Sequence, residues 1–584
     1  MGAGYGRISA RTVQAAGESV GARHPAETEW GPMWRSTGRN PWLAACGIVA
    51  LAAGIALHSL RHKTLTADEP QHYRYGAQLL HGDARRFDDS KMPVSALNAA
   101  ACEIGARWMP GGEAERGEAP LPCHPTAARI PTVVFAALTG LLVFAWSRSL
   151  YGPGPALFST ILFALDPNLI AHSRLVTTDT YATGAILLAT YAFWRYVERG
   201  GFGRAALAGL CFGASQLAKY TAAYLLPVFA LLLLLRGTGR FRGGLAAGVR
   251  PVRLAAQLAV LACAGLLAVN AGFLFEGTGT ALGGYRFRSD LFRVVQERAG
   301  RLAELPLPLP VPYLEGMDWV KANETQGSFG NLYLLGELRR RGPDLEGFAG
   351  YFFVVGLFKE PLATLAAVAW ALAGLLVWRR ERPLGGELFL LVPLAFFAVY
   401  FNFFFRAQIG IRFFLVALPF VFILAGSALR AFGGRRWSVP LAGALAAYLV
   451  GSVLSYHPHY LSYTNELVPD RKLAYRYVAD SNLDWGQNRW YLRRYLREHP
   501  GVVAYPREPM PGRLLVDVNR LVGVFNRPRY RWLREGFTPV EHVAHSYLVF
   551  EVAPGELGPA QPGAPEAGGP SPPASGEPPS SARP

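Results

Sequence analysis

The chain is poor in charged residues. Only 17% of its 584 residues are Asp, Glu, Lys or Arg, whereas soluble domains usually carry about 25%. A single hydrophobic core stops growing near about 250–300 residues, so a soluble protein of this length would need several domains with ordinary charged surfaces. The hydrophobic residues, 51% of the chain, instead lie in long runs. These features exclude a soluble multidomain protein and indicate an integral membrane protein.

Cysteine is also scarce. The chain has 5 cysteines, too few for a fold held together mainly by disulfides. Cys46, Cys211 and Cys263 lie in apolar runs, where we expect them to pack as small hydrophobic side chains. Cys102 and Cys123 fall in one long polar loop, and a disulfide between them is possible if that loop faces an oxidising compartment.

The apolar runs predict about 11 transmembrane helices. A spanning helix needs about 20 mostly apolar residues. The predicted spans are 41–60, 130–147, 149–165, 180–194, 205–218, 220–235, 254–275, 361–378, 388–405, 413–429 and 437–456. Only Lys219 interrupts the stretch 205–235, which is too long for one helix, so we predict two helices that meet at a tight turn there.

The excess of basic residues predicts the orientation of the chain. The formal net charge is +17, and the surplus Lys and Arg lie mainly in the N-terminal segment and in short loops, as on the cytoplasmic side of membrane proteins. The two long loops, 61–129 and 276–360, are nearly balanced in charge. We therefore predict that the N-terminus is cytoplasmic and that both long loops and the C-terminus are extracytoplasmic. No nucleic acid is needed to explain the charge.

This orientation predicts four regions. Residues 1–40 form a cytoplasmic N-terminal segment, and residues 41–456 form the transmembrane core. Residues 457–552 form a small α/β domain on the outer face, with strand-like patterns at 513–525 and 544–552. Residues 553–584, rich in Pro, Gly and Ala, form a disordered tail.

Acidic and aromatic side chains gather just beyond the predicted spans rather than within them. This placement favours chemistry at the outer membrane interface. The first group, after the first span, contains Asp68, Glu69, His72 and Tyr73. Asp68 and His72 are four residues apart and share one face of a helix. This pattern fits either a capped interfacial helix or a carboxylate that acts as a general base.

Cations on short outer turns form the second group. Lys219, Arg406 and Arg412 lie on the predicted outer side, although the surplus Lys and Arg residues of the chain lie mainly on the cytoplasmic side. His172 and Asp179 lie on another outer turn. The cations fit an anionic lipid headgroup, because Arg binds phosphate through two hydrogen bonds and Lys binds it as a point charge. The alternatives are polar turn residues and a lysine that snorkels to the interface.

The third group lies in the C-terminal region. Acids and amides flank a tryptophan at Asp480, Asn482, Asp484, Trp485 and Gln487. Ring stacking and hydrogen bonds to hydroxyls would suit sugar binding, whereas a helix cap beside a packed tryptophan is the plain structural alternative. The nearby pair His457 and His459 is weak evidence for a metal site, and no metal is predicted.

Several of these segments together resemble a known family. They are Asp68-Glu69, Lys91-Met92-Pro93, Thr177-Thr178-Asp179, Leu217-Ala218-Lys219-Tyr220 and Gly410-Ile411-Arg412-Phe413-Phe414. In order and sidedness, residues 42–552 resemble the lipid-linked-sugar glycosyltransferases of the GT-C superfamily. The most similar members are the dolichyl-phosphate-mannose–protein mannosyltransferases and the bacterial aminoarabinose transferases. The second long loop, 276–360, diverges from that pattern.

The resemblance implies an inverting glycosyltransferase in a bacterial inner membrane, with a polyprenyl-phosphate-linked sugar as donor and an acceptor hydroxyl or amine on a protein, lipid or glycan. It implies that Asp68 is the general base and that Glu69 orients it or the acceptor. The expected phosphate-binding residues are Lys219, Arg412, Arg406 and Lys91. The expected substrate-binding residues are His72, Tyr73, His172, Asp179, Asp480, Asn482, Asp484, Trp485 and Gln487. No cofactor is expected. The alternatives are a transporter or flippase of lipid-linked sugars and a structural membrane scaffold.

Overall fold

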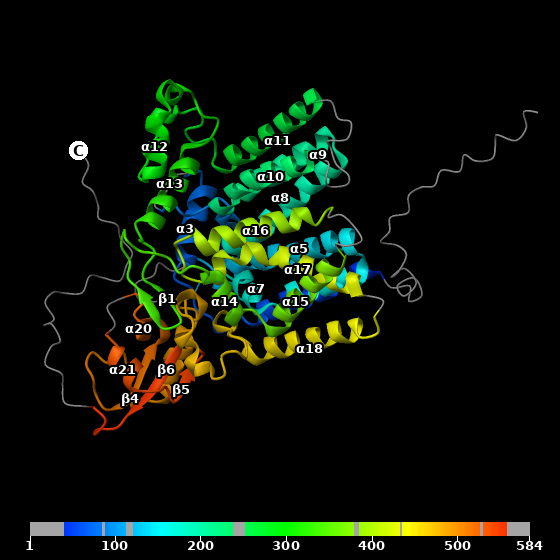
Figure 1. The fold of residues 1–584 in the computed structure, drawn as a ribbon. Helices are drawn as coiled ribbons and strands as arrows, with labels where there is room; N and C mark the ends of the chain where they lie inside the picture. Colours follow the sequence, from blue (N-terminus) through cyan, green and yellow to red (C-terminus); the bar gives the residue numbers. More distant parts are fainter. Residues whose placement is uncertain are drawn as a thin grey trace, which may run out of the picture.

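A computed structural model of the chain describes residues 40–83, 88–111, 121–237, 251–378, 385–432, 435–525 and 529–557. The predicted cytoplasmic segment 1–40 and the predicted tail 553–584 therefore lie almost wholly outside the described residues. The described part is mainly helical, and most of its long helices run side by side (Figure 1).

Each predicted span corresponds to a helix. The helices are α2 (Pro41–His58), α5 (Pro125–Tyr151), α6 (Pro153–Ala164), α8 (Asp179–Arg199), α9 (Phe202–Gln216), α10 (Leu225–Gly237), α11 (Pro251–Gly272), α15 (Leu362–Trp378), α16 (Leu388–Phe403), α17 (Leu418–Phe432) and α18 (Ser438–Tyr456). In the described part of the chain, five helical segments are long and apolar enough to cross a membrane, or up to seven if each of two bent pairs counts as one span. The membrane class is thus supported, whereas the count of eleven stays a prediction.

Proline and side-chain caps determine where several of these helices begin. Pro41, Pro125 and Pro153 stand in the first turns of α2, α5 and α6, where proline costs no hydrogen bond and its fixed φ suits a helix. The Asn40 side chain accepts a hydrogen bond from the Trp42 backbone N–H at 3.0 Å, which satisfies one of the free donors at the start of α2.

Two helices bend sharply into a neighbour. α6 meets α7 (Pro167–Ser173) at 63°, and α14 (Tyr351–Lys359) meets α15 at 118°. Pro167 and Pro361 follow the breaks, and a proline cannot continue the preceding helix. The Asp166 carboxylate accepts a hydrogen bond from the Leu169 backbone N–H at 2.8 Å and so caps α7. The bend before α15 explains why the aromatic segment ahead of residue 361 does not extend that span.

The predicted turn at Lys219 is confirmed. α9 ends at Gln216, and the short 3-10 helix η2 (Tyr220–Tyr224) leads directly into α10. Glycines on one face allow α9 to lie close to α11. A Cβ atom at Gly209 would stand 2.1 Å from the Leu261 carbonyl oxygen, and one at Gly213 would stand 2.5 Å from the Gly265 carbonyl oxygen. Small residues four apart permit such close helix packing in membranes.

The two long predicted loops carry short elements at one end of the helical bundle (Figure 1). The first contains α3 (Glu69–Leu80) and α4 (Ser95–Gly105), and the second contains α12 (Asp290–Arg298), α13 (Val311–Thr325) and the antiparallel hairpin β1 (Leu332–Leu334) and β2 (Glu337–Arg339). Leu335 and Gly336 form the two-residue hairpin turn, and both have positive φ. Glycine adopts this conformation readily, which suits a tight turn of this kind.

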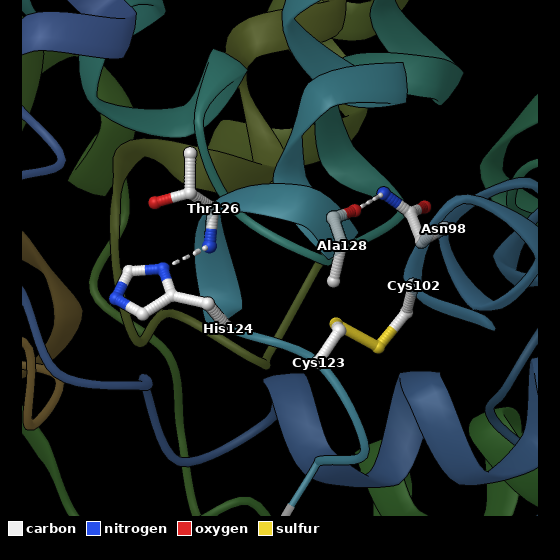
Figure 2. Close-up of a disulfide and its surroundings, with 6 residues drawn as sticks. All are labelled: Asn98, Cys102, Cys123, His124, Thr126 and Ala128. Atoms are coloured by element: carbon white, nitrogen blue, oxygen red, sulfur yellow. Dashed lines mark hydrogen bonds between the residues drawn. A yellow bond between two sulfur atoms is a disulfide. The ribbon is translucent and has the colours of Figure 1, made fainter. Parts of the chain in front are cut away.

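Cys102 and Cys123 form a disulfide, the pairing that the sequence left open (Figure 2). It joins α4 to the segment just before α5. The Asn98 side-chain amide donates to the Ala128 carbonyl at 2.7 Å, which adds a second link between the same two helices. The His124 ring caps α5 by accepting a hydrogen bond from the Thr126 backbone N–H at 3.3 Å. These contacts fix α4 against the start of α5.

The C-terminal region contains a four-stranded sheet in the order β3-β4-β6-β5, with β3 parallel to β4 and the other pairs antiparallel. Its elements are α19 (Arg489–Glu498), β3 (Val502–Ala504), β4 (Gly512–Asp517), α20 (Val518–Val522), α21 (Arg531–Gly536), β5 (Glu541–Val543) and β6 (Tyr547–Val552). The predicted strand at 513–525 is wrong after Asp517, because the Asp517 carboxylate caps α20 through the Arg520 backbone N–H at 2.8 Å.

The sheet packs against the helical bundle rather than standing apart from it. Leu514, Val516 and Phe550 from one face of the sheet belong to the same buried apolar cluster as Trp146 in α5. The other face of the sheet contacts α19, through Leu515 among others. A mixed α/β unit therefore lies at the expected place in the sequence, on the same continuous core as the helices.

Candidate functional site

A cavity of about 720 Å³ lies where the first and second long loops meet α16 and the ends of α8, α9 and η2. Both charged and aromatic side chains line it. The charged residues are Asp68, Asp88, Lys91, Asp179, Lys219, Lys321, Glu324 and Arg412, and the aromatic residues include Trp319, Phe329, Tyr400, Phe401, Phe405 and Phe413. A mixed lining of this kind can bind a molecule that has an anionic group and an apolar part.

Asp68 and Arg412, which are 344 positions apart in the sequence, form an ion pair in this cavity. Asp68 immediately precedes α3, and its side chain makes no capping hydrogen bond with the helix. The Arg412 Nη1 atom instead donates to its Oδ2 atom at 3.0 Å. The Asp68 side chain keeps 31% of its surface exposed and that of Arg412 11%, so the carboxylate is accessible from the cavity.

Aromatic packing fixes the Arg412 side chain. Its guanidinium carbon lies 4.1 Å from the centre of the Trp485 ring and 5.1 Å from that of Phe413. The buried Arg412 Nε atom has no hydrogen-bond partner among the described residues. The Arg412 guanidinium is thus held at the cavity wall, where a charge-assisted hydrogen bond to an anionic ligand can form.

Lys219 forms a second ion pair at the cavity wall. Its Nζ atom donates to Asp179 Oδ1 at 2.6 Å and lies 4.3 Å from the centre of the Phe413 ring. Lys219 lies in the turn between α9 and η2, and Asp179 begins α8. The Lys219 ammonium and the Arg412 guanidinium thus both lie close to the Phe413 ring, which places the two cations in the same part of the cavity.

Lys91, Asp88 and His72 form the third charged group. The Lys91 ammonium lies 3.3 Å from the Asp88 carboxylate. His72 is on α3, one turn after Asp68, and its Nδ1 atom lies 3.2 Å from Ser95 Oγ. Burial and the nearby Lys91 charge lower the pKa of His72 to about 3, so His72 is neutral near pH 7.

The surrounding cations keep Asp68 ionised. Burial alone would raise the pKa of Asp68, but the positive charges of Arg412 and Lys91 outweigh burial and hold this pKa below its usual value. An ionised carboxylate that is partly exposed in a cavity can accept a proton from a bound hydroxyl group. Asp68 is therefore in the ionised form that a general base requires.

Glu69 lies away from the cavity although it adjoins Asp68. Its side chain is fully buried, and its Oε2 atom lies 2.6 Å from Arg129 Nη2. It also accepts hydrogen bonds from the Val176 backbone N–H at 2.9 Å and the Thr66 backbone N–H at 2.7 Å. This arrangement ties α3 to α5, and it differs from the predicted role of Glu69 in orienting Asp68 or the acceptor.

Three other predicted site residues also lie outside the cavity lining. Tyr73 packs against the buried cluster that contains the Cys102–Cys123 disulfide. His172 is buried, with its ring centre 6.3 Å from that of Trp485. Arg406 has an exposed side chain, and its backbone N–H donates to Glu324 Oε1 at 3.0 Å.

The segment Asp480–Gln487 lies behind Arg412 instead of lining the cavity. The Asn482 Oδ1 atom accepts a hydrogen bond from the Ile411 backbone N–H at 2.9 Å, and Ser481 Oγ donates to the Ile409 carbonyl at 2.5 Å. Trp485 supplies the ring on which the Arg412 guanidinium packs. These contacts of Asn482, Ser481 and Trp485 fix the turn that carries Arg412.

Of the remaining predicted residues in that segment, Asp484 and Gln487 are buried and Asp480 is half-buried. The Gln487 Oε1 atom accepts a hydrogen bond from the Trp485 backbone N–H at 2.6 Å. Asp480 has a φ of 59°, an uncommon conformation for a residue other than glycine. Burial raises the pKa of both Asp480 and Asp484 to about 7.

The sequence did not point to Lys321 and Glu324. Both lie on α13, and the Lys321 Nζ atom lies 3.0 Å from Glu324 Oε2 at the cavity wall. Their spacing of three residues on a helix was a usable signal, but it is common in ordinary surface helices. In the described part of the chain, no cluster of three or more His, Cys, Asp or Glu side chains could hold a metal ion.

A comparison with protein families agrees with the resemblance that the sequence motifs indicated. Residues 124–246 match the family model of the dolichyl-phosphate-mannose-protein mannosyltransferases. This segment includes Arg129, Asp179 and Lys219. Among proteins with curated descriptions, none matches the sequence of this chain.

Several solved structures are similar, among them the following three. ArnT from Cupriavidus metallidurans bound to undecaprenyl phosphate has a TM-score of 0.44 at 13% identity, over 88% of this chain and 98% of that chain. The Saccharomyces cerevisiae protein O-mannosyltransferase Pmt1-Pmt2 complex has a TM-score of 0.34 at 20% identity, over 40% and 33%. The Archaeoglobus fulgidus oligosaccharyltransferase has a TM-score of 0.47 at 12% identity, over 73% and 56%. The resemblance to the dolichyl-phosphate-mannose–protein mannosyltransferases is thus confirmed by the family model over residues 124–246.

Proposed function

We propose that the protein is a membrane glycosyltransferase that transfers a sugar from a polyprenyl-phosphate carrier to an acceptor hydroxyl or amine at the outer membrane face. One observation carries the proposal: the ionised Asp68 carboxylate shares a cavity with Arg412 and Lys219. A carboxylate for the acceptor and cations for a departing phosphate are the groups that this reaction needs.

In the proposed reaction, the acceptor oxygen attacks the anomeric carbon of the donor sugar while Asp68 takes the acceptor proton. A bond forms between the acceptor oxygen and the anomeric carbon, and the bond from that carbon to the phosphate oxygen breaks. The phosphate leaves with the bonding electron pair, so no general acid is required. Attack from the side opposite the phosphate inverts the anomeric configuration. A glycoside hydrolase, whose leaving group is poorer, requires two carboxylates.

The cations of the cavity would bind the donor phosphate. Arg412 supplies a guanidinium that lines the cavity, and Lys219 supplies a point charge. Lys91 lines the same cavity and is the third candidate, whereas the exposed Arg406 lies outside the lining. Arg412, Lys219 and Lys91 each already pair with a carboxylate, so we expect these cations to contact both the phosphate and their acidic partners.

The aromatic wall would bind the apolar part of the carrier. The ring centres of Phe413 and Phe405 are 5.1 Å apart, and those of Phe405 and Tyr400 are 6.1 Å apart. These rings lead from the cations toward α16, an apolar helix. A polyprenyl chain beside the phosphate would therefore meet apolar side chains instead of water.

Transfer of radioactive label tests this proposal. The purified protein in proteoliposomes is incubated with radiolabelled polyprenyl-phosphate sugars and with membranes that supply acceptors, and the protein, lipid and glycan fractions are counted. We expect one fraction to gain label with the parent protein, and to gain it about 10²–10⁴-fold more slowly with Asp68→Asn. Label that stays on the carrier while the carrier crosses the bilayer would identify the alternative, a flippase, and would overturn the proposal.

A further inference from the structure

Helix α12 has an apolar face that the described part of the protein leaves exposed. Leu291, Val294 and Val295 lie on one face at helical spacing and are 56%, 39% and 53% exposed, and no residue of α12 is buried. Leu302 and Leu305, which follow shortly after the helix, are also exposed, at 65% and 54%. We call these five residues the α12 apolar patch. Exposed patches of this kind mark interaction sites.

The rest of α12 is fixed to the protein, so the apolar patch has a defined orientation. The Gln296 side-chain amide donates to the carbonyls of Leu282 and Tyr285 at 2.8 and 3.0 Å. The Phe292 ring lies 5.2 Å from that of Phe287 and lines the cavity, as Leu291 does. Gln296 and Phe292 thus hold one side of the helix while Val294 and Val295 face outward.

The position of α12 places the patch beside the membrane. α12 follows α11, which is long and apolar enough to span and only 17% buried within the protein. Leu274 and Phe275, directly after α11, are 48% and 54% exposed. In Figure 1, α12 (green) runs across the direction of α11 rather than along it. A helix that crosses the end of a lipid-facing span lies in the plane of the membrane surface.

The charges around the patch favour an anionic membrane surface. The segment 282–305 contains five arginines and three acids. All five arginines are exposed: Arg286, Arg288, Arg293, Arg298 and Arg301. An amphipathic helix with arginine and exposed Leu or Val inserts its apolar face about 5–10 Å into the headgroup and acyl boundary, and basic side chains there attract anionic lipids.

We propose that α12 is an interfacial anchor whose apolar patch inserts into the leaflet on the cavity side and whose arginines bind anionic phospholipid headgroups. Because Leu291 and Phe292 also line the cavity, this anchor holds the cavity at headgroup level, where a lipid substrate can enter sideways. The anchoring itself does not depend on the proposed transfer reaction.

The test measures the depth of a label on α12 in nanodiscs. Cys46, Cys211 and Cys263 are replaced by alanine, and the Cys102–Cys123 disulfide is kept. Single cysteines are then introduced as Val295→Cys on the apolar patch and, as a matched control, Glu297→Cys on the polar side. Each carries a fluorescent label that is quenched either by nitroxide on lipid chains or by aqueous iodide. If Val295→Cys prevents folding, Val294→Cys replaces it.

We expect lipid nitroxide to quench the label at 295 and iodide to quench the label at 297. We also expect quenching at 295 to be stronger with phosphatidylglycerol than with phosphatidylcholine alone, and this difference to be lost in Arg298→Gln/Arg301→Gln. Iodide quenching at both positions would show that the patch faces water and would overturn the proposal. Protection of the label at 295 from both quenchers would show that protein covers the patch, with the same consequence.

Discussion

Replacing Glu69 by glutamine should destabilise the protein, although the neighbouring Asp68 can be replaced without such a cost. Glu69 and Arg129 are 0% and 1% exposed and form an ion pair at 2.6 Å, and Glu69 also accepts the backbone N–H groups of Thr66 and Val176. Glutamine keeps the shape of the side chain but leaves the buried arginine charge uncompensated. Breaking a buried pair in this way costs about 3–5 kcal/mol.

Denaturant titrations of the purified variants in detergent measure this effect through the free energy of unfolding. Asp68→Asn is the matched control, because the Asp68 side chain is 31% exposed, so its loss should cost less unfolding free energy than the loss of the fully buried Glu69. Glu69→Gln/Arg129→Met should recover part of the loss, since it buries no unpaired charge. If Glu69→Gln unfolds at the same denaturant concentration as the parent yet loses transfer, Glu69 takes part in the chemistry and its structural role is wrong.

Three further outcomes follow from particular contacts. Lys219→Ala should weaken binding of a polyprenyl-phosphate sugar about 10- to 100-fold, because a hydrogen bond to a charged group contributes about 1.5–3 kcal/mol. Lys219→Arg should restore most of the binding affinity. If equilibrium binding shows that Lys219→Ala keeps the parent affinity, the phosphate binds elsewhere. Replacing Cys102 and Cys123 by serine should cost about 3 kcal/mol of unfolding free energy from loop closure, and a melting temperature equal to the parent's would contradict this. Burial lowers the pKa of His459 to about 3 and that of His545 well below its usual value. The free energy of unfolding should therefore be largest above about pH 6.5 and should fall as the pH drops below that value, because the unfolded chain then binds more protons at these histidines. Unfolding titrations at pH 7.5 and 5.5 measure this difference, and equal stability at both would refute it.

Local patterns predicted the elements of the fold well. The apolar runs gave the position of each long helix, and the single charge at Lys219 marked the turn between α9 and η2. The hydrophobic patterns predicted the wrong element where a single side chain caps a helix. The apolar residues after Asp517 read as a continued strand, but the Asp517 carboxylate caps a helix there. The number of spans stays open because bends at Pro167 and Pro361 divide apolar stretches.

The candidate site was predictable only in part, because its members come together through packing. The chemical types of Asp68, Lys219 and Arg412 indicated a common function, but nothing in the sequence gives the contact between residues 344 positions apart. Glu69 has the same chemistry as Asp68, and only its buried contact with Arg129 separates the two. The Asp480–Gln487 segment has the composition of a sugar site, and its contact with the Arg412 turn, through Asn482, could not be read from that composition.

Donor binding and sugar transfer, measured on the same preparation of Asp68→Asn, decide whether Asp68 and the cations of the cavity serve one reaction. The cations remain in this variant, so a polyprenyl-phosphate sugar should bind with nearly the parent affinity. Transfer should fall by about 10²–10⁴-fold, the usual contribution of a general base. Transfer at the parent rate with unchanged binding would contradict the assignment of Asp68 as the base.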